Sequence, residues 1–273
     1  MTTYPSALRT VDLCKSFSSG LWSRPVSVLD RVNLDIRQGE MFGLLGPNGA
    51  GKTTTMRAAL GLIHPSSGEV RIFERPAHEW EARRRVGFLP EAPYLHDHLT
   101  AEGCLRFFGQ LCEMDGIGLA RRVGVLLELV GLEGARNRRL RTFSKGMLQR
   151  VAIAQAMIND PDLLLLDEPM SGLDPIGRRE MRQMLLRLSR QGKTIVMSSH
   201  LLQDVELLCD RAAILSHGRV ATVAAVKRLP NDEEDATDYR GSEVAPGEGR
   251  QASVTALETL YCNVVGEKRG DAA

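Results

Sequence analysis

The sequence lacks any long apolar segment. No stretch among its 273 residues approaches the roughly 18 uninterrupted apolar residues that a membrane-spanning helix needs. The opening residues, MTTYPSALRT, contain no apolar region of the kind found in secretory signal peptides. We therefore expect that any role of this chain at a membrane depends on a partner protein.

The sequence also lacks an excess of either charge. Its 35 lysines and arginines nearly balance 34 aspartates and glutamates, which gives a net charge of +1 and a pI near 7.7. Proteins that bind polyanions usually carry a basic excess or a basic face, so we expect no nucleic acid partner. With 43% hydrophobic and 25% charged residues, the chain has enough apolar side chains for one large α/β domain or two small ones.

Cysteines are few, and none form a CxxC pair, which argues against a zinc ribbon and against a disulfide framework. A reducing cytosol fits this pattern best. The five cysteines are Cys14, Cys104, Cys112, Cys209 and Cys262.

Apolar runs alternate with helical patterns over residues 40–220, which predicts a parallel sheet covered by helices. The runs MFGLLG, DLLLLDEP and KTIVMSSH are typical of strands buried on both faces. Residues 28–36 alternate apolar and polar side chains, as expected of a strand with one buried face. AAILSHGRVATVA predicts a hairpin that turns at His217 and Gly218. Ligands of parallel sheets bind beyond the carboxyl ends of the strands, so we expect functional residues there.

Residues 99–160 carry no strand pattern and contain two helix starts. Thr100 precedes AEGCLRFFGQLCEM and Ser144 precedes KGMLQRVAIAQAMI, which predicts a helical insertion between strands of the sheet. Residues 228–252 are polar and rich in Gly, Pro and acid, and we interpret them as a linker. A short helix is expected over VTALETLYCNVVG.

The segment GPNGAGKTT lies between an apolar strand and the helical run TTTMRAALGL, and it matches the phosphate-binding pattern GxxxxGK[ST]. Its glycines let backbone amides turn inward around phosphate oxygens, and the N-terminus of the following helix adds positive potential. Lys52 is expected to reach the β- and γ-phosphates, and the Thr53 hydroxyl to bind Mg²⁺. The nucleotide-binding residues of this segment are Gly46, Pro47, Asn48, Gly49, Ala50, Gly51, Lys52, Thr53 and Thr54.

Charged and imidazole side chains follow two other buried strands. Asp167 and Glu168 end DLLLLDEP, and adjacent residues at a strand end can point in different directions. Asp167 is a candidate to hold Mg²⁺, and Glu168 to orient and deprotonate the water that attacks the γ-phosphate. His200, after KTIVMSS, is expected to hydrogen bond to the γ-phosphate or to that water. Lys52, Glu168 and His200 are thus the predicted catalytic residues. The simpler alternatives are that the acidic pair caps a following helix and that His200 has a structural role.

The stretch FSKGMLQR places a hydroxyl, a cation and a glycine at a helix entrance. Ser144 as N-cap, close backbone approach at Gly146 and the positive helix end form half of an anion site. A plain helix cap is the alternative. Met147, Val151, Ala154 and Ile158 are spaced to anchor the helix to a core.

The order GPNGAGKTT, GFLPE, FSKGMLQR, LLLLDEP, SGLDP and SSH resembles the nucleotide-binding subunit of ATP-binding cassette (ABC) transporters over residues 6–225. The resemblance implies an α/β fold in which a P-loop NTPase parallel sheet, covered by helices, carries an antiparallel β-subdomain and an α-helical subdomain at about residues 92–160. Residues 226–273 are then the polar linker and short C-terminal helix.

The resemblance also implies roles that local patterns do not show. Two copies pack head to tail, so that Ser144 and Gly146 of one copy clamp the γ-phosphate held by the other. Asp174, in SGLDP, lies at the interface between copies. Glu91, in GFLPE, stands where many members carry a glutamine at the Mg²⁺ site. Phe17 aligns with the aromatic residue that stacks on adenine, and the alternative for that role is Trp22.

The signature departs from the commoner Leu-Ser-Gly-Gly-Gln at Phe143, Lys145 and Met147. Together with GFLPE and SSHLLQDVELLCDR, it resembles the subgroup paired with ABC-2-type permeases, most of which are exporters. This implies a homodimer that uses ATP and Mg²⁺ to drive an integral-membrane permease from the cytoplasmic face of the cell membrane. A groove near Tyr94 and Leu95 is expected to receive the permease, although core packing is the alternative for both residues. Two other hypotheses are a soluble ABC-type switch acting on ribosomes or DNA, and a small-molecule kinase.

Overall fold

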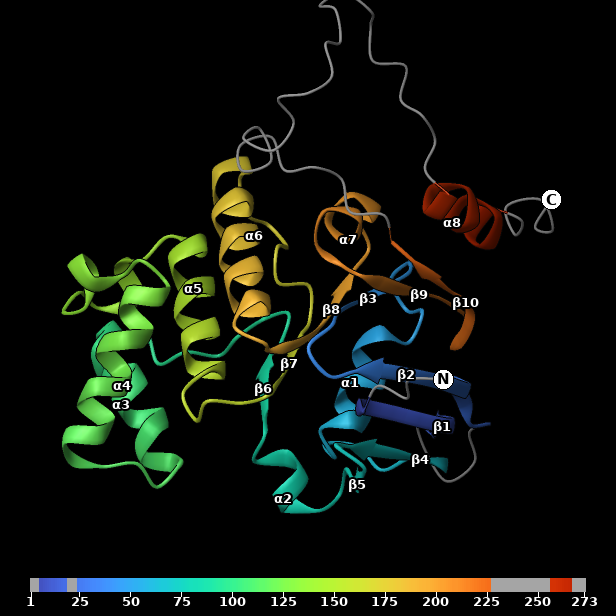
Figure 1. The fold of residues 1–273 in the computed structure, drawn as a ribbon, viewed down its shortest axis with the longest axis horizontal. Helices are drawn as coiled ribbons and strands as arrows, with labels where there is room; N and C mark the ends of the chain where they lie inside the picture. Colours follow the sequence, from blue (N-terminus) through green and yellow to red (C-terminus); the bar gives the residue numbers. More distant parts are fainter. Residues whose placement is uncertain (1–4, 19–23, 227–255, 267–273) are drawn as a thin grey trace, which may run out of the picture.

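The computed structural model describes residues 5–18, 24–226 and 256–266, which form two sheets and a set of helices (Figure 1). The strands are β1 (Ser6–Phe17), β2 (Val26–Arg37), β3 (Met41–Leu45), β4 (Ser67–Ile72), β5 (Arg75–Pro76), β6 (Val86–Leu89), β7 (Leu163–Leu166), β8 (Thr194–Ser199), β9 (Arg211–Ser216) and β10 (Arg219–Ala225). The helices are α1 (Lys52–Ala59), α2 (Trp80–Arg83), α3 (Ala101–Leu111), α4 (Gly116–Leu129), α5 (Lys145–Ala156), α6 (Pro175–Arg190), α7 (Leu202–Leu208) and α8 (Ala256–Gly266), with 3₁₀ turns at Glu133–Ala135 and Leu140–Thr142.

The larger sheet confirms the predicted parallel arrangement. Its strand order is β10-β9-β3-β8-β7-β6, and every neighbouring pair is parallel except β9 with β10. All residues of β3, β7 and β8 are buried, as their continuous apolar sequences predict. The β9–β10 hairpin turns at His217 and Gly218, which both have positive φ, as predicted. The strands thus bring the ends of β3, β8 and β7 to one edge.

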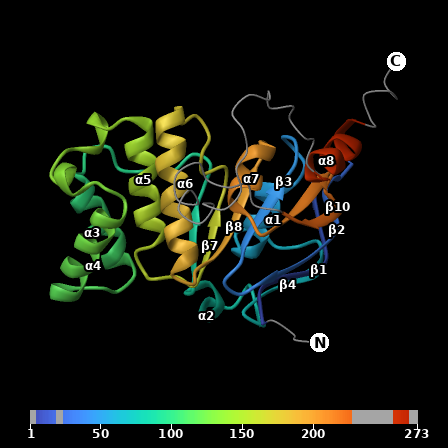
Figure 2. The same ribbon diagram turned by 45° about the horizontal axis from the view of Figure 1, so that its top comes forward.

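Two layers cover the two faces of this sheet (Figure 2). Two hydrophobic cores lie on the two faces of β7. Leu163 and Leu165 pack in the core formed with the four-stranded sheet and α1, and Leu164 and Leu166 pack in the core formed with helices α3 to α6. The smaller sheet is antiparallel, with the order β2-β1-β4-β5. In β2, Val32, Leu34 and Ile36 are buried between exposed neighbours, which confirms the predicted strand with one buried face. The strand extends slightly beyond the predicted residues 28–36 at both ends.

Helices α3, α4 and α5 follow β6 and precede β7, and they pack on one another beyond the β6 edge (Figure 1). Both predicted helix starts are confirmed, because the Thr100 side chain accepts a hydrogen bond from Gly103 N, and the Ser144 side chain accepts one from Met147 N. The predicted helical runs were too long at their ends. The run from Ala101 stops at Leu111, since Glu113 has a positive φ, and α1 stops at Ala59, before the positive φ of Gly61.

Helix α8 confirms the helix expected near the end of the chain. It packs on β9 and β10 and buries Leu257 in the larger core. The predicted linker at residues 228–252 lies outside the described residues. In the part of the chain that the structure describes, no helix combines the length and the apolar character needed to cross a membrane.

Candidate nucleotide-binding and catalytic site

The phosphate loop joins the end of β3 to the start of α1. Its backbone conformation and its close packing require glycine at several positions. Gly49 and Gly51 have φ values of 80° and 105°, a region that side chains strongly disfavour. A Cβ at Gly46 would lie 2.4 Å from the Leu215 carbonyl oxygen of β9. The loop backbone therefore lies tightly against the sheet edge, with the positive end of α1 behind it, as in sites that bind phosphate.

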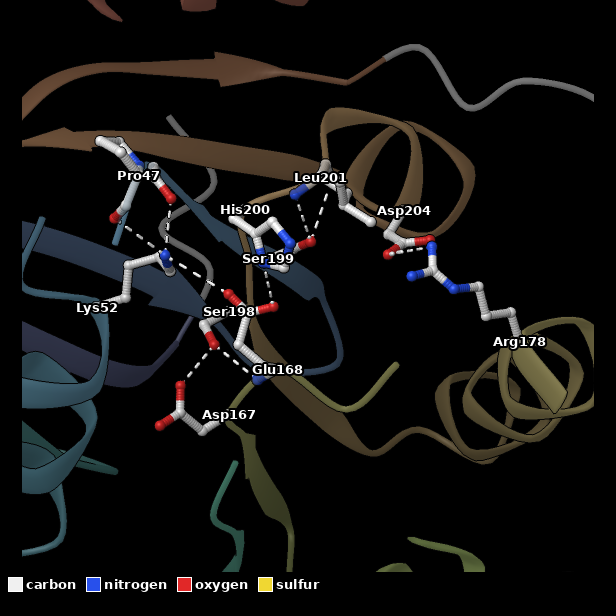
Figure 3. Close-up of polar contacts among 11 residues, drawn as sticks. Pro47, Lys52, Asp167, Glu168, Arg178, Ser198, Ser199, His200, Leu201 and Asp204 are labelled. Atoms are coloured by element: carbon white, nitrogen blue, oxygen red, sulfur yellow. Dashed lines mark hydrogen bonds and ion pairs between the residues drawn. The ribbon is translucent and has the colours of Figure 1, made fainter. Parts of the chain in front are cut away.

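Lys52 reaches back over this loop. Its Nζ donates hydrogen bonds to the carbonyl oxygens of Gly46 (2.7 Å) and Pro47 (3.2 Å), and lies 3.5 Å from Glu168 Oε1 (Figure 3). The side chain is only 6% exposed. A buried ammonium group held by neutral carbonyls and one carboxylate can exchange these contacts for phosphate oxygens, which are stronger partners.

The acidic pair at the end of β7 contacts two different groups (Figure 3). Ser198 Oγ donates to Asp167 Oδ1 at 2.6 Å and accepts from Glu168 N at 2.8 Å. Glu168, which has a positive φ of 48°, extends the other way and lies 2.8 Å from His200 Nδ1 through its Oε2. The structure therefore brings Lys52, Glu168 and His200 together, with the Glu168 carboxylate between the two basic groups.

The predicted Mg²⁺ ligands lie around the same edge. Thr53 is in the first turn of α1, and Asp167 is buried at the end of β7. Glu91 is exposed two residues after β6, whose Leu89 carbonyl accepts a hydrogen bond from Asp167 N. Among the described residues no group of three or more His, Cys, Asp or Glu side chains is placed to hold a metal by itself. The Thr53 hydroxyl and the carboxylates of Asp167 and Glu91 still fit Mg²⁺, which prefers oxygen ligands and usually completes its coordination with water and substrate phosphates.

The signature stretch begins α5. Within the described residues, no hydrogen bond or ion pair joins Ser144, Lys145 or Gly146 to the phosphate loop of the same chain. Strands β7 and β8 stand between α5 and α1 in both views (Figures 1 and 2). Gln149 of α5 donates to the Pro169 carbonyl oxygen at 3.0 Å, and this bond ties the signature helix to the residue after Glu168.

Two further predicted residues lie on the surface. Asp174 is the N-cap of α6, and its Oδ1 accepts a hydrogen bond from Gly177 N at 2.8 Å. Phe17, at the end of β1, is 45% exposed, and the Lys15 ammonium lies 4.9 Å from its ring centroid. One ring face is thus occupied by a cation. The alternative residue, Trp22, lies outside the described residues.

Three residues of this region were not predicted from the sequence: Ser198, Arg178 and Asp204. For Ser198 the sequence did contain a signal: two serines end an otherwise apolar buried strand, and buried hydroxyls need hydrogen-bond partners. Arg178 and Asp204 lie in helices whose patterns are ordinary, so nothing local marked them.

Ser198→Ala is expected to destabilise the site. The change removes the donor to Asp167 and the acceptor for Glu168 N at a fully buried position, so the free energy of unfolding should fall by about 1–3 kcal/mol. Chemical denaturation measures this change. Ser199→Ala is the matched control, since the buried Ser199 hydroxyl bonds only within its own turn, to Leu201. An equal loss in both variants would contradict a special role for Ser198.

The parallel sheet, the glycine loop before α1 and the acidic pair at the neighbouring strand end define a P-loop nucleoside triphosphatase. The family model described as ABC transporter matches residues 29–171. An uncharacterized ABC transporter ATP-binding protein of Nostoc sp. is 46% identical over 228 residues, which cover 82% of this chain and 68% of the relative. The chain therefore belongs to the ATP-binding proteins of the ABC transporter family, and it is an ATPase.

Other relatives are named for transport. Nod factor export ATP-binding protein I of Cupriavidus metallidurans is 38% identical over 80% of this chain and 74% of its own length. The bacitracin transport ATP-binding protein BcrA of Bacillus licheniformis is 39% identical over 78% of this chain and 68% of its own length. A dimeric ATP-binding cassette in a post-hydrolysis state with ADP and Pi is similar in structure, with a TM-score of 0.73 and 28% identity over 81% of this chain and all of that one. These matches agree with the predicted family and fold.

Proposed function

We propose that two copies of this chain close head to tail on ATP and that hydrolysis drives export through a separate integral-membrane permease at the cytoplasmic face of the membrane. The observation that carries the proposal is the pair of incomplete half-sites in one chain. The phosphate loop, Glu168 and His200 form one half, and the start of α5 at Ser144 and Gly146 forms the other. The names of relatives, Nod factor export and bacitracin transport, support the transport role.

In this mechanism the side chains divide phosphate binding and water activation between them. Lys52 exchanges the loop carbonyls and Glu168 for the β- and γ-phosphate oxygens. The freed Glu168 carboxylate orients and deprotonates the attacking water. His200 holds that carboxylate in place through Nδ1 and offers its second ring nitrogen to the γ-phosphate. Ser144 and Gly146 of the second copy complete the γ-phosphate site with hydroxyl and amide donors. Phe17 offers its open ring face to adenine, and Asp174 lies at the interface between copies.

Thr53, Asp167 and Glu91 are the residues that would hold Mg²⁺. When bound, the ion supplies positive charge that neutralises the phosphate oxygens during transfer. Ser198 keeps the Asp167 carboxylate oriented through its hydrogen bond.

The permease contact is proposed at the surface after β6. Tyr94 is 84% exposed and its ring lies edge-on to His96, which in turn contacts Phe107 of α3. Leu95 packs against the larger core, so the structure favours Tyr94 as the contact residue. An exposed aromatic group beside a helical subdomain suits an apolar face of a partner helix.

Affinity purification tests the proposal. Tagged Glu168→Gln protein, purified with ATP from gently solubilised native membranes, should retain a stoichiometric polytopic membrane protein, identified by mass spectrometry. Adding Tyr94→Ala should lower that recovery several-fold, whereas Trp80→Ala, at another exposed aromatic position, should not. Ribosomes or DNA-associated proteins in place of a membrane protein would support the soluble switch. ATP hydrolysis without any acceptor molecule argues against the kinase.

A further inference from the structure

An ion pair joins the helix after His200 to the helix after Asp174. Arg178 Nη1 of α6 lies 3.9 Å from Asp204 Oδ2 of α7 (Figure 3). The Asp204 side chain is only 5% exposed. Burial raises the pKa of this carboxyl above its usual value, while Arg178 and Arg182 act in the opposite direction. A buried carboxylate of this kind depends on its arginine partner to remain charged.

Arg178 has a second contact, through a different nitrogen of its guanidinium group. Its Nε donates to the Leu173 carbonyl oxygen at 3.4 Å. Leu173 belongs to the loop at residues 171–175, which follows the catalytic strand β7 and contains the N-cap, Asp174, and the first residue of α6. One planar side chain therefore contacts both this loop and α7, a geometry that the rigid fork of arginine permits and a lysine ammonium does not reproduce.

Asp204 also interacts electrostatically with Glu168 and His200. It lies in the first turn of α7, four residues after His200, whose Nδ1 is 2.8 Å from Glu168 Oε2. The charge of Glu168 raises the pKa of Asp204, and that of His200 lowers it. A displacement of His200 thus acts on Asp204, and through Arg178 on residues 171–175.

We propose that Arg178 and Asp204 are positioning residues that transmit γ-phosphate occupancy at His200 to the loop at residues 171–175. This inference rests on the proposed function, in which that loop faces the second copy. When the γ-phosphate is present, the pair holds the His200 segment and the loop in the arrangement that the second copy binds. Neither residue touches the nucleotide.

Substitutions in the full-length Glu168→Gln protein test the link. Asp204→Asn and Arg178→Met each remove one charge, and each should raise the ATP concentration needed for dimerisation by about tenfold, within the range typical of coupling between sites. The Kd of the monomer for a fluorescent ATP analogue should stay within about twofold, because the nucleotide contacts are intact. The double variant should be no worse than either single variant, since the two residues act as one unit. Dimerisation is measured by analytical ultracentrifugation.

Two further variants separate positioning from simple stabilisation. Asp204→Glu should restore ATP-dependent dimerisation, because the 3.9 Å separation leaves room for a longer carboxylate. Glu180→Gln is the matched control, since it breaks another cross-helix ion pair of α6, at 3.7 Å from Arg150, away from α7. Thermal unfolding of every variant records stability, and the control should leave ATP-dependent dimerisation unchanged even if its exposed ion pair contributes a little to stability.

The outcomes separate the two proposals. If Glu168→Gln protein dimerises on ATP and Asp204→Asn leaves the required ATP concentration unchanged, the link is wrong while the proposed dimer stands. Additive effects of the two single substitutions, or an equal effect of Glu180→Gln, also overturn the link. If Glu168→Gln protein fails to dimerise at any ATP concentration, the proposed head-to-tail function itself is wrong.

Discussion

Replacing Glu168 by glutamine should lower the kcat of ATP hydrolysis by about 10²- to 10⁴-fold, the usual contribution of a general base. The amide matches the carboxylate in shape but accepts no proton from water. Because Glu168 Oε1 lies 3.5 Å from Lys52 Nζ, the substitution also removes a negative charge that competes with phosphate for this lysine. We therefore expect ATP affinity to be equal to or higher than that of the wild type, and an ATP-bound dimer to accumulate.

Phosphate release and size-exclusion chromatography with ATP measure the two effects. Glu180→Gln is the control for loss of a glutamate charge outside the site, and it should hydrolyse ATP at the wild-type rate. Unchanged hydrolysis by Glu168→Gln protein would remove Glu168 from the role of base. Loss of both hydrolysis and ATP binding would indicate that its contacts with Lys52 and His200 mainly hold the site together.

Two inactive variants should regain activity when they are mixed. Lys52→Ala removes the phosphate-binding cation, and Gly146→Asp places a negative charge in the signature. A Cβ at Gly146 meets only Leu173 Cδ2, at 3.7 Å, and an acid in the first helical turn is favourable, so the fold should tolerate aspartate. Each homodimer should lose at least about 10²-fold in hydrolysis, as expected when a cation at the transferred phosphate is removed or a negative charge is placed beside it.

The heterodimer contains both lesions in one composite site and none in the other, if the signature serves the partner's nucleotide. With random mixing about half of the two-fold dimers are mixed, so hydrolysis should return to about a quarter of the wild-type rate for independent sites. A mixture of Lys52→Ala and Glu168→Gln is the control and should stay inactive, because each lesion spoils the site on its own chain. Two affinity tags confirm that heterodimers form. Mixed dimers without hydrolysis would contradict the trans arrangement.

Local sequence was sufficient for the buried strands, for two helix starts and for the phosphate loop. A glycine at each constrained position, a strand buried on both faces and a cap such as Ser144 are set by interactions within a few residues, and the structure confirms these features. The helix ends were less well predicted, because left-handed residues such as Glu113 stop a helix without a distinctive sequence signal. The roles of Asp174, Glu91 and Phe17 remain predictions.

The sequence by itself determined the family, the parallel sheet and the segments that carry the site. Only the tertiary structure decided which side chains meet within it. Ser198 contacts Asp167 across 31 residues, and Arg178 reaches Asp204 between two helices. These contacts follow from strand order, which places β8 between β3 and β7, and from the packing of α6 on α7. Periodicity records whether a side chain is buried, but the identity of its neighbour depends on how distant segments assemble.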